Sequence, residues 1–271
     1  MCAYSLISIL SPLISIRITR PANPPLVLNV HAALFDVDGT IVDSSQPIFD
    51  FWKDFAKDKP DFDAQYIYDT CHGWRTFDVI AKYAPQFADP DYVNQLEGSV
   101  PDKFGSSAKE IPGAIDLVNT LLNMETGDDK QRIAVGTSGT YDMASKWFNI
   151  LGLTRPEVFI TAEDVTNGKP DPEPYLMGRN MLGYGDADKK VVVFEDAPAG
   201  VKAGHGAGCF VVGIASTFDA DFVKECGADA VVKDLRSVKV TGYNPVDDTF
   251  QLHIDEYHHV SDRLLSICKQ F

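Results

Sequence analysis

The stretch "HAALFDVDGTIVDSS", residues 31–45, ends an apolar run with two aspartates that are separated by a single valine. Side chains alternate along a strand, so Asp36 and Asp38 would share one face while Val37 points back toward the core. Two neighbouring carboxylates repel each other unless a cation lies between them or one of them holds a proton. Gly39 follows, and glycine lets the backbone turn sharply or approach a ligand closely. On its own, the stretch fits either a strand that ends in a polar turn or a carboxylate pair that carries chemistry.

The composition limits the class of partner. The chain has 271 residues, which is enough for one large α/β domain or for a core domain with an insert. Its net charge of −15 argues against a nucleic-acid partner, because phosphate backbones are bound by clustered Lys and Arg. A small phosphate ligand needs only a local positive charge. The charge therefore leaves a small phosphorylated polyol or sugar open as substrate, and we expect no nucleic-acid partner, no membrane partner and a monomer.

The cysteines indicate a reducing compartment. There are five, widely scattered along the chain and without a Cys-x-x-Cys pair. Such cysteines are typical of reduced thiols, so we expect a cytoplasmic protein.

The first 30 residues differ from the rest of the chain. They are apolar and rich in serine, include Arg17 and Arg20, and precede the first acidic residue, Asp36. The apolar run is too short to span a bilayer and is interrupted by Pro12. We expect residues 1–30 to be a disordered leader, with a mitochondrial presequence as the alternative.

From residue 110 onward, short β-branched runs alternate with amphipathic helical stretches. Runs that are apolar throughout and are separated by helices indicate parallel strands buried on both faces of a sheet. The predicted strands are residues 132–137, 157–162, 191–196, 209–215 and 229–232, and residues 31–37 supply the first strand. The sequence therefore predicts an α/β fold, a Rossmann-like parallel sheet core with helices on both faces, built from residues 31–45 and 110–271.

Residues 46–109 lack a convincing buried strand. They contain helix-like pieces such as "QPIFDFWKDFAKD" and "RTFDVIAKYAP". Because this segment follows the first strand, we expect a helical cap over the carboxyl edge of the sheet, where open α/β folds bind their ligands.

Polar residues follow several of the predicted strands, and the carboxyl ends of parallel strands meet at one edge. The candidates are Asp36, Asp38, Thr137, Ser138, Lys169, Glu195 and Asp196. Carboxylate oxygens are hard ligands suited to Mg²⁺, whereas hydroxyl and backbone N–H groups can hold phosphoryl oxygens. A lysine can balance both carboxylates and phosphate, and aspartate is a known covalent nucleophile toward phosphorus. The set therefore fits phosphoryl chemistry.

Four segments in this order, "DVDGT", "VGTSGT", "GKPDPEPY" and "VVVFEDAPAGV", resemble the four motifs of the haloacid dehalogenase-like hydrolases. The resemblance covers residues 31 to about 270, and the helical insert resembles the cap of that superfamily. More narrowly, "FWKDFAKDKPDFDAQ", "HGWRTFDVIAKYAP" and "EPYLMGRN" look like the fungal glycerol-3-phosphate (glycerol-1-phosphate) phosphatases.

The resemblance implies a role for each motif residue. Asp36 would attack phosphorus and become an aspartyl phosphate, and Asp38 would act as general acid and then general base. Mg²⁺ would be bound by the Asp36 carboxylate, the Asp38 backbone carbonyl and Asp196, with Glu195 binding directly or through water. The phosphoryl oxygens would be held by Thr137, the Ser138 N–H and Lys169.

The cap would select the substrate, because the sheet motifs are all used by phosphate, metal and proton transfer. Within "HGWRTFD" we expect His72, Gly73 and Arg75 to meet the substrate, the first and last as hydrogen-bond donors. Trp74 and Phe77 are expected in the core of the cap.

Other functions share parts of this pattern. The 2-deoxyglucose-6-phosphate phosphatases fit "DGTIVDSS" at least as well, and β-phosphoglucomutase-type phosphomutases share the fold and all four motifs. A dehalogenase is disfavoured because those relatives lack the second aspartate. A catalytically dead regulatory protein is disfavoured because no motif residue is missing.

Overall fold

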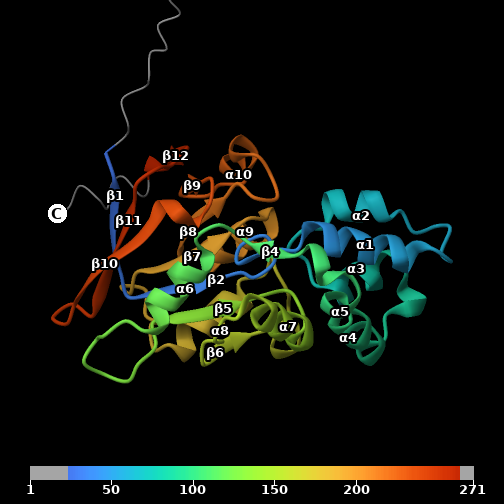
Figure 1. Ribbon diagram of the computed structural model, residues 1–271, viewed down its shortest axis with the longest axis horizontal. Coiled ribbons are helices and arrows are strands. Elements are labelled where there is room, and N and C mark those ends of the chain that lie inside the picture. The colour runs from blue at the N-terminus through green and yellow to red at the C-terminus, as the bar shows by residue number, and fades with distance from the viewer. Residues whose placement is uncertain (1–23, 263–271) are drawn as a thin grey trace, which may run out of the picture.

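The computed structural model describes residues 24–262, and a seven-stranded sheet forms the centre of the fold (Figure 1). The strand order is β12-β9-β8-β7-β2-β5-β6, and every neighbouring pair is parallel except β12 with β9. The strands are β2 (Ala32–Phe35), β5 (Ile133–Gly136), β6 (Val158–Ile160), β7 (Val191–Glu195), β8 (Phe210–Ile214), β9 (Ala230–Val232) and β12 (His259–Val260). The expected α/β class with a mostly parallel sheet is confirmed.

Both faces of this sheet are buried, which explains the uninterrupted apolar runs. In β7, Val192 and Phe194 pack into one hydrophobic cluster, while Val191 and Val193 pack into another on the opposite face. The helices around the sheet are α6 (Ala114–Leu122), α7 (Tyr141–Leu151), α8 (Glu173–Met181), α9 (Pro198–Gly206) and α10 (Ala220–Glu225). The first two of them share one cluster with the second sheet described next, and the other three contribute to the opposite cluster.

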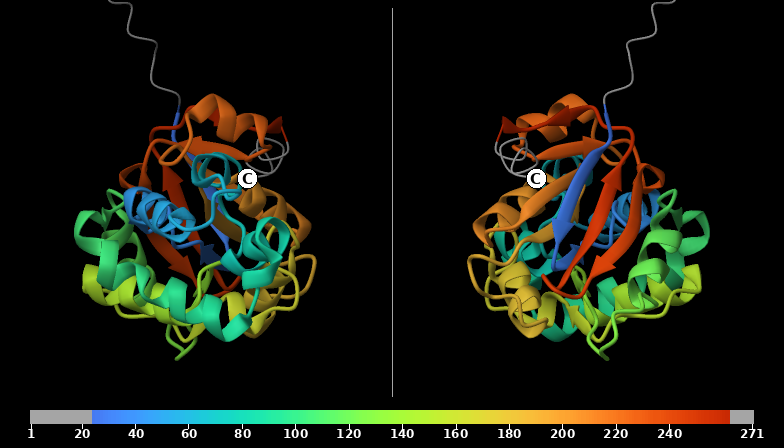
Figure 2. Two further views of the ribbon diagram at one scale, coloured as in Figure 1. Left: turned by 90° about the vertical axis from the view of Figure 1, so that its right-hand side faces the viewer. Right: turned by 90° about the vertical axis from the view of Figure 1, so that its left-hand side faces the viewer.

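A second, antiparallel sheet lies at the end of the molecule that faces away from the cap (Figure 2, right). It consists of β1 (Leu26–Val30), β11 (Thr249–Ile254) and β10 (Val238–Asn244), in the order β1-β11-β10. The prediction that residues 1–30 form a disordered leader is therefore wrong for residues 26–30. Leu26, Leu28 and Val30 are buried on one face of β1, and the strand pairs with β11 along its whole length. The predicted presequence falls mainly in residues 1–23, outside the described residues.

Five α-helices extend from the carboxyl edge of the main sheet, in the segment predicted as the helical cap (Figures 1 and 2). They are α1 (Ser45–Ala56), α2 (Ala64–Thr70), α3 (Thr76–Tyr83), α4 (Pro90–Gly98) and α5 (Val100–Phe104), with short 3-10 turns at Pro85–Phe87 and Gly105–Ser107. The chain enters and leaves them through the paired strands β3 (Val42–Asp43) and β4 (Lys109–Glu110). The buried rings of Trp52, Phe55 and Phe62 pack against one another, one pair stacked and two pairs edge-on, and give the helices an apolar interior of their own.

This topology brings the ends of several strands to the cap. Because β2, β5 and β7 are adjacent and parallel, the residues that follow them meet at one edge. Within the described part of the chain, no helix has the length and apolar character needed to cross a membrane.

Candidate active site

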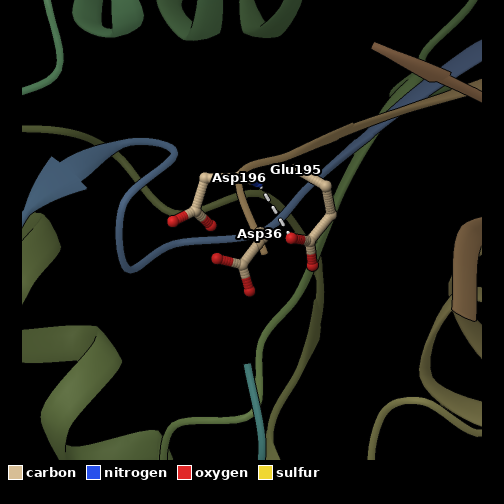
Figure 3. A group of neighbouring side chains, drawn as sticks. All are labelled: Asp36, Glu195 and Asp196. Atoms are coloured by element: carbon tan, nitrogen blue, oxygen red, sulfur yellow. Dashed lines mark hydrogen bonds between the residues drawn. The ribbon is translucent and has the colours of Figure 1, made fainter. Parts of the chain in front are cut away.

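Three buried carboxylates meet where β2 and β7 end (Figure 3). Asp36 follows β2, Glu195 is the last residue of β7, and Asp196 comes next. One carboxylate oxygen from each lies within 4.8 Å of the others, and the three residues are 6%, 0% and 3% exposed. The dashed line in Figure 3 is the hydrogen bond from the Asp196 N–H to Glu195 Oε2, at 3.0 Å. Three clustered carboxylates carry more negative charge than a buried site tolerates without cations.

One cation of the protein offsets part of this charge. The loop before α8 brings in Lys169, whose Nζ donates to Asp36 Oδ1 at 2.6 Å and to Glu195 Oε1 at 2.7 Å. Burial disfavours the ammonium form, but Asp36 and Glu195 raise the pKa of Lys169 above its ordinary value. Burial raises the pKa of Asp36 to about 8, with Lys169 opposing the shift and Glu195 adding to it. These four groups comprise one ammonium and three carboxylates. A further cation bound beside them would offset the remaining negative charge.

One carboxylate oxygen of Asp196 has an environment that a bound metal ion would explain. Its Oδ1 is buried and has no hydrogen-bond partner, which is costly for a carboxylate oxygen. Burial, followed by the negative charge of Glu195, raises the pKa of Asp196 well above its ordinary value. Gly39 makes this arrangement sterically feasible, since its φ is +81° and a Cβ there would lie 2.0 Å from Asp196 Oδ2. An unpartnered carboxylate oxygen beside Asp36 fits a hard divalent cation.

Glu195 differs from the other two carboxylates because all its hydrogen-bonding capacity is used. Oε1 accepts from Lys169 and from the Tyr175 hydroxyl, and Oε2 accepts from the N–H groups of Asp196 and Ala197. A carboxylate has about four acceptor positions, so the four donors fill them. Glu195 is therefore well placed to hold Lys169 and the β7 turn.

Asp38 lies in the turn after β2, and its carboxylate is hydrogen-bonded at the point where the chain enters the cap. The Ser44 hydroxyl donates to Asp38 Oδ1 at 2.5 Å. Burial raises the pKa of Asp38, and the Ser44 hydrogen bond opposes that shift. A pKa shifted upward by burial is the direction that a general acid requires.

The two residues after β5 take different positions. The Thr137 side chain is buried, and its Oγ1 accepts from the Gly139 N–H at 3.0 Å. The Ser138 hydroxyl donates instead to the Gly73 carbonyl of the cap, at 2.8 Å. Thus Ser138 joins core and cap through its side chain as well as lining the site.

A cavity of about 90 Å³ lies between this sheet edge and the cap. It is lined by core residues, among them Asp36, Asp38, Thr137, Ser138 and Asp196, and by cap residues, among them Trp52, His72, Gly73, Trp74, Thr76 and Glu97. The candidate residues of the core are thus all brought together, and Lys169 and Glu195, which do not line the cavity, join the others through Asp36.

The predicted cap residues divide into two groups. His72 and Gly73 line the cavity, and the His72 ring packs edge-on against Tyr68 and Phe218. Burial lowers the pKa of His72 below its ordinary value, which favours the neutral ring. Trp74 was expected in the core of the cap, but it is 36% exposed and stands at the rim of the cavity.

Arg75, which was predicted to contact the substrate, does not line the cavity. Its guanidinium pairs with both oxygens of Asp78, at 2.8 and 3.0 Å. It also donates to the backbone carbonyls of Val165 at 2.9 Å and Thr166 at 3.0 Å, across the boundary between cap and core. The reason is geometric: Arg75 precedes α3, and its side chain reaches outward to the loop after β6 rather than inward. Arg75 therefore ties the cap to the core.

Sequence reasoning missed Glu97, a buried carboxylate of α4 that lines the cavity. Its position within "DPDYVNQLEG" is that of an ordinary amphipathic helix, and nothing in this pattern distinguishes it from a solvent-facing glutamate. Only the docking of the cap on the core brings it to the site.

The comparisons with known proteins agree with this geometry. Residues 33–214 match the family described as haloacid dehalogenase-like hydrolase. Glycerol-1-phosphate phosphohydrolase 1 of Saccharomyces cerevisiae is 55% identical over 246 residues, which cover 89% of this chain and 97% of the relative. The 2-deoxyglucose-6-phosphate phosphatase 2 of the same yeast is 37% identical, over 80% of this chain and 92% of that one. A β-phosphoglucomutase crystal structure from Clostridium difficile has a TM-score of 0.62 at 22% identity, covering 78% of this chain and 93% of that one, which shows the shared fold.

Proposed function

The chain belongs to the haloacid dehalogenase-like hydrolases, and from this premise we propose that it hydrolyses glycerol 1-phosphate (glycerol 3-phosphate) to glycerol and phosphate. The observation that carries the proposal is that Asp36 and Asp38 open together onto one cavity of about 90 Å³. The cavity is smaller than the roughly 300–1,000 Å³ of clefts for drug-sized ligands, which fits a small phosphate ester as substrate. The yeast relative at 55% identity supports the same substrate.

Asp36 is the proposed nucleophile. Its carboxylate attacks phosphorus, the bond from phosphorus to the alcohol oxygen breaks, and an aspartyl phosphate forms at Asp36. Asp38 gives its proton to the departing alcohol oxygen and then takes a proton from the water that hydrolyses the aspartyl phosphate. The Ser44 hydroxyl supports this role by fixing the Asp38 carboxylate beside the cavity.

The phosphoryl group would be held by the residues around Asp36. Thr137 and the Ser138 N–H, at the end of β5, are the proposed ligands of its oxygens. The Lys169 ammonium, hydrogen-bonded to Asp36, offsets the negative charge that gathers when a phosphate approaches a carboxylate. Glu195 holds that ammonium in place.

We also propose that Asp36, Asp196 and the Asp38 backbone carbonyl hold a Mg²⁺ ion, with Glu195 in a supporting role. The unpartnered Asp196 Oδ1 supports this assignment, and phosphatases of the family generally use this ion. When bound, the ion neutralises the charge of the phosphoryl oxygens. Turnover should stop on exhaustive chelation and return with added Mg²⁺.

A panel of phosphate esters assayed for phosphate release tests the substrate. We expect a higher kcat/KM for glycerol 1-phosphate than for 2-deoxyglucose 6-phosphate. The reverse order would move the protein to the activity named for the 37% identical relative. Rearranged sugar phosphate without released phosphate would indicate a phosphomutase. We further propose a cytoplasmic monomer, which fractionation and light scattering of the full chain would test.

A further inference from the structure

Glu97 is a carboxylate at the site that the proposed phosphoryl chemistry does not use. It belongs to α4, is 4% exposed and lines the same cavity as Asp38. Its Oε1 accepts from the Thr76 hydroxyl at 2.6 Å, and its Oε2 accepts from the Thr140 N–H at 3.1 Å. Among residues 24–262, it forms no ion pair with a lysine, arginine or histidine. A buried carboxylate without a cation needs hydrogen-bond donors for its remaining lone pairs.

The cavity is where those donors would be found. Two hydrogen bonds fill about half of the acceptor positions of a carboxylate. Burial raises the pKa of Glu97 to about 7, with the Thr76 hydrogen bond opposing the shift and the charge of Asp38 adding to it. The carboxylate is therefore short of donors as it stands, and a ligand rich in hydroxyl groups would supply them.

The position of Glu97 relative to Asp38 fits the alcohol end of the substrate. Consecutive residues contact the two carboxylates: a Cβ at Gly139 would be 3.5 Å from Asp38 Oδ2, and the Thr140 N–H donates to Glu97 Oε2. Asp38 is the proposed acid for the departing alcohol oxygen, so the alcohol lies on its side of the phosphorus. Glu97 reaches that side from the cap.

We propose that Glu97 recognises the free hydroxyl groups of the substrate alcohol and thereby selects polyol phosphates over esters that lack those hydroxyls. This inference rests on the proposed phosphatase function. A site that hydrogen-bonds a substrate hydroxyl discriminates strongly against analogues without it, because its buried polar groups are then left unpaired.

Glu97 could instead serve only to join cap and core, through Thr76 and Thr140. The two roles predict different kinetics. Loss of a cap tie would slow every phosphate ester by the same factor. Loss of hydroxyl recognition would slow only the esters that carry hydroxyls.

The test compares glycerol 1-phosphate with propyl phosphate, which has the same three carbons but lacks the two hydroxyls. At pH 8, above the pKa of Glu97, we expect kcat/KM for glycerol 1-phosphate to fall about 10–100-fold in Glu97→Gln, as for a lost hydrogen bond to a charged group. We expect kcat/KM for propyl phosphate to change less than about twofold. Equal losses for both esters, or no loss for either, would overturn the proposal.

Glu163→Gln is the matched control. Glu163 is exposed and accepts from the Tyr141 N–H, one residue beyond the Glu97 contact on the same helix, but it does not line the cavity. The control removes one carboxylate from the same helix end and should leave kcat/KM for both esters unchanged. Should Glu97→Gln fail to fold, Glu97→Asp keeps the charge but withdraws it by one methylene, and a loss confined to glycerol 1-phosphate is again expected.

Measuring substrate binding to an inactive protein distinguishes recognition of the substrate from its turnover. With the inactive Asp36→Asn protein, calorimetry should give a Kd for glycerol 1-phosphate that rises about 10-fold or more when Glu97→Gln is added, and an unchanged Kd for propyl phosphate. A wild type that does not hydrolyse glycerol 1-phosphate would contradict the proposed function, and the Glu97 role with it. A wild type that prefers glycerol 1-phosphate, with an unaltered preference in Glu97→Gln, would contradict the Glu97 role alone.

Discussion

The two halves of the site differ in how their residues are positioned. In the core half, Asp36, Asp38, Glu195 and Asp196 stand at or near the ends of buried parallel strands. Lys169 comes from the loop before α8 and joins Asp36 to Glu195 through short charged hydrogen bonds. The cap half, His72, Gly73, Arg75 and Glu97, lies on helices and turns that reach the core through contacts across a boundary. Topology brings the first set together, whereas the second set depends on how one body docks on another. We infer that the core half carries the reaction and the cap half carries selection.

The largest expected effect is in the core half. Asp36→Asn should lower kcat by about 10³-fold or more, since it removes the proposed nucleophile while keeping the volume. Steady-state phosphate release measures this, and circular dichroism should show an intact fold. Asp61→Asn, at an exposed position of the cap, is the control and should retain full activity. Appreciable turnover by pure Asp36→Asn would remove the reaction from the core half.

The next effect concerns the buried ion pairs. Lys169→Met leaves Asp36 and Glu195 without their shared cation, so unfolding in buffer without divalent ions should be about 3–5 kcal/mol easier. Adding Glu195→Gln should restore part of that stability without restoring activity, because the double variant has one less unpaired carboxylate. Chemical denaturation of the wild type, the two single variants and the double variant gives the coupling free energy between Lys169 and Glu195. Additive losses would show that the two residues act independently.

Substitution of Arg75 should lower stability without changing substrate preference, the reverse of the result expected for Glu97. Arg75→Ala should lower the free energy of unfolding by about 2–4 kcal/mol, because carbonyls of Val165 and Thr166 lose a charged donor. Its kcat/KM values for glycerol 1-phosphate and propyl phosphate should fall by the same factor. Arg75→Lys should recover little, since one ammonium cannot replace the planar fork. A loss confined to glycerol 1-phosphate would return Arg75 to substrate recognition.

The smallest effect is a pH dependence of stability. Burial raises the pKa of Glu97 from its ordinary value of 4.5 to about 7 in the folded protein. Between these values the folded state binds more protons than the unfolded state, so stability falls as pH rises. Relative to Glu97→Gln, the wild type should lose about 1–3 kcal/mol from pH 4.5 to pH 7, measured by denaturation at each pH. A constant difference between the two proteins would show that folding does not shift the pKa of Glu97.

The same division separates what the sequence could predict from what it could not. Val191–Glu195 is an uninterrupted apolar run that ends in a carboxylate, so both the strand and the position of its last residue follow from the pattern. Leu26–Val30 alternates buried and half-buried residues in a short stretch beside a serine-rich leader, and its partner β11 is more than 200 residues away. Local pattern carries no information about such a distant pairing.

The cap residues show the same limit. Arg75 and Glu97 are both charged residues of an amphipathic helical segment, and nothing in the sequence pattern distinguishes their positions in the fold. One points outward to carbonyls of the core and the other points into the cavity. The difference arises from the docking angle of the cap, which depends on side chains of both bodies.

The most direct test of the account is to identify the residue that takes the phosphoryl group. Wild-type protein mixed with glycerol 1-phosphate and quenched within one turnover would be reduced with borohydride, which converts an acyl phosphate of aspartate to homoserine. Peptide mass spectrometry then locates the change. We predict homoserine at position 36, absent from Asp36→Asn and unchanged in position in Glu97→Gln. Homoserine at position 38 or 196, or none at any aspartate, would contradict the assignment of the reaction to Asp36.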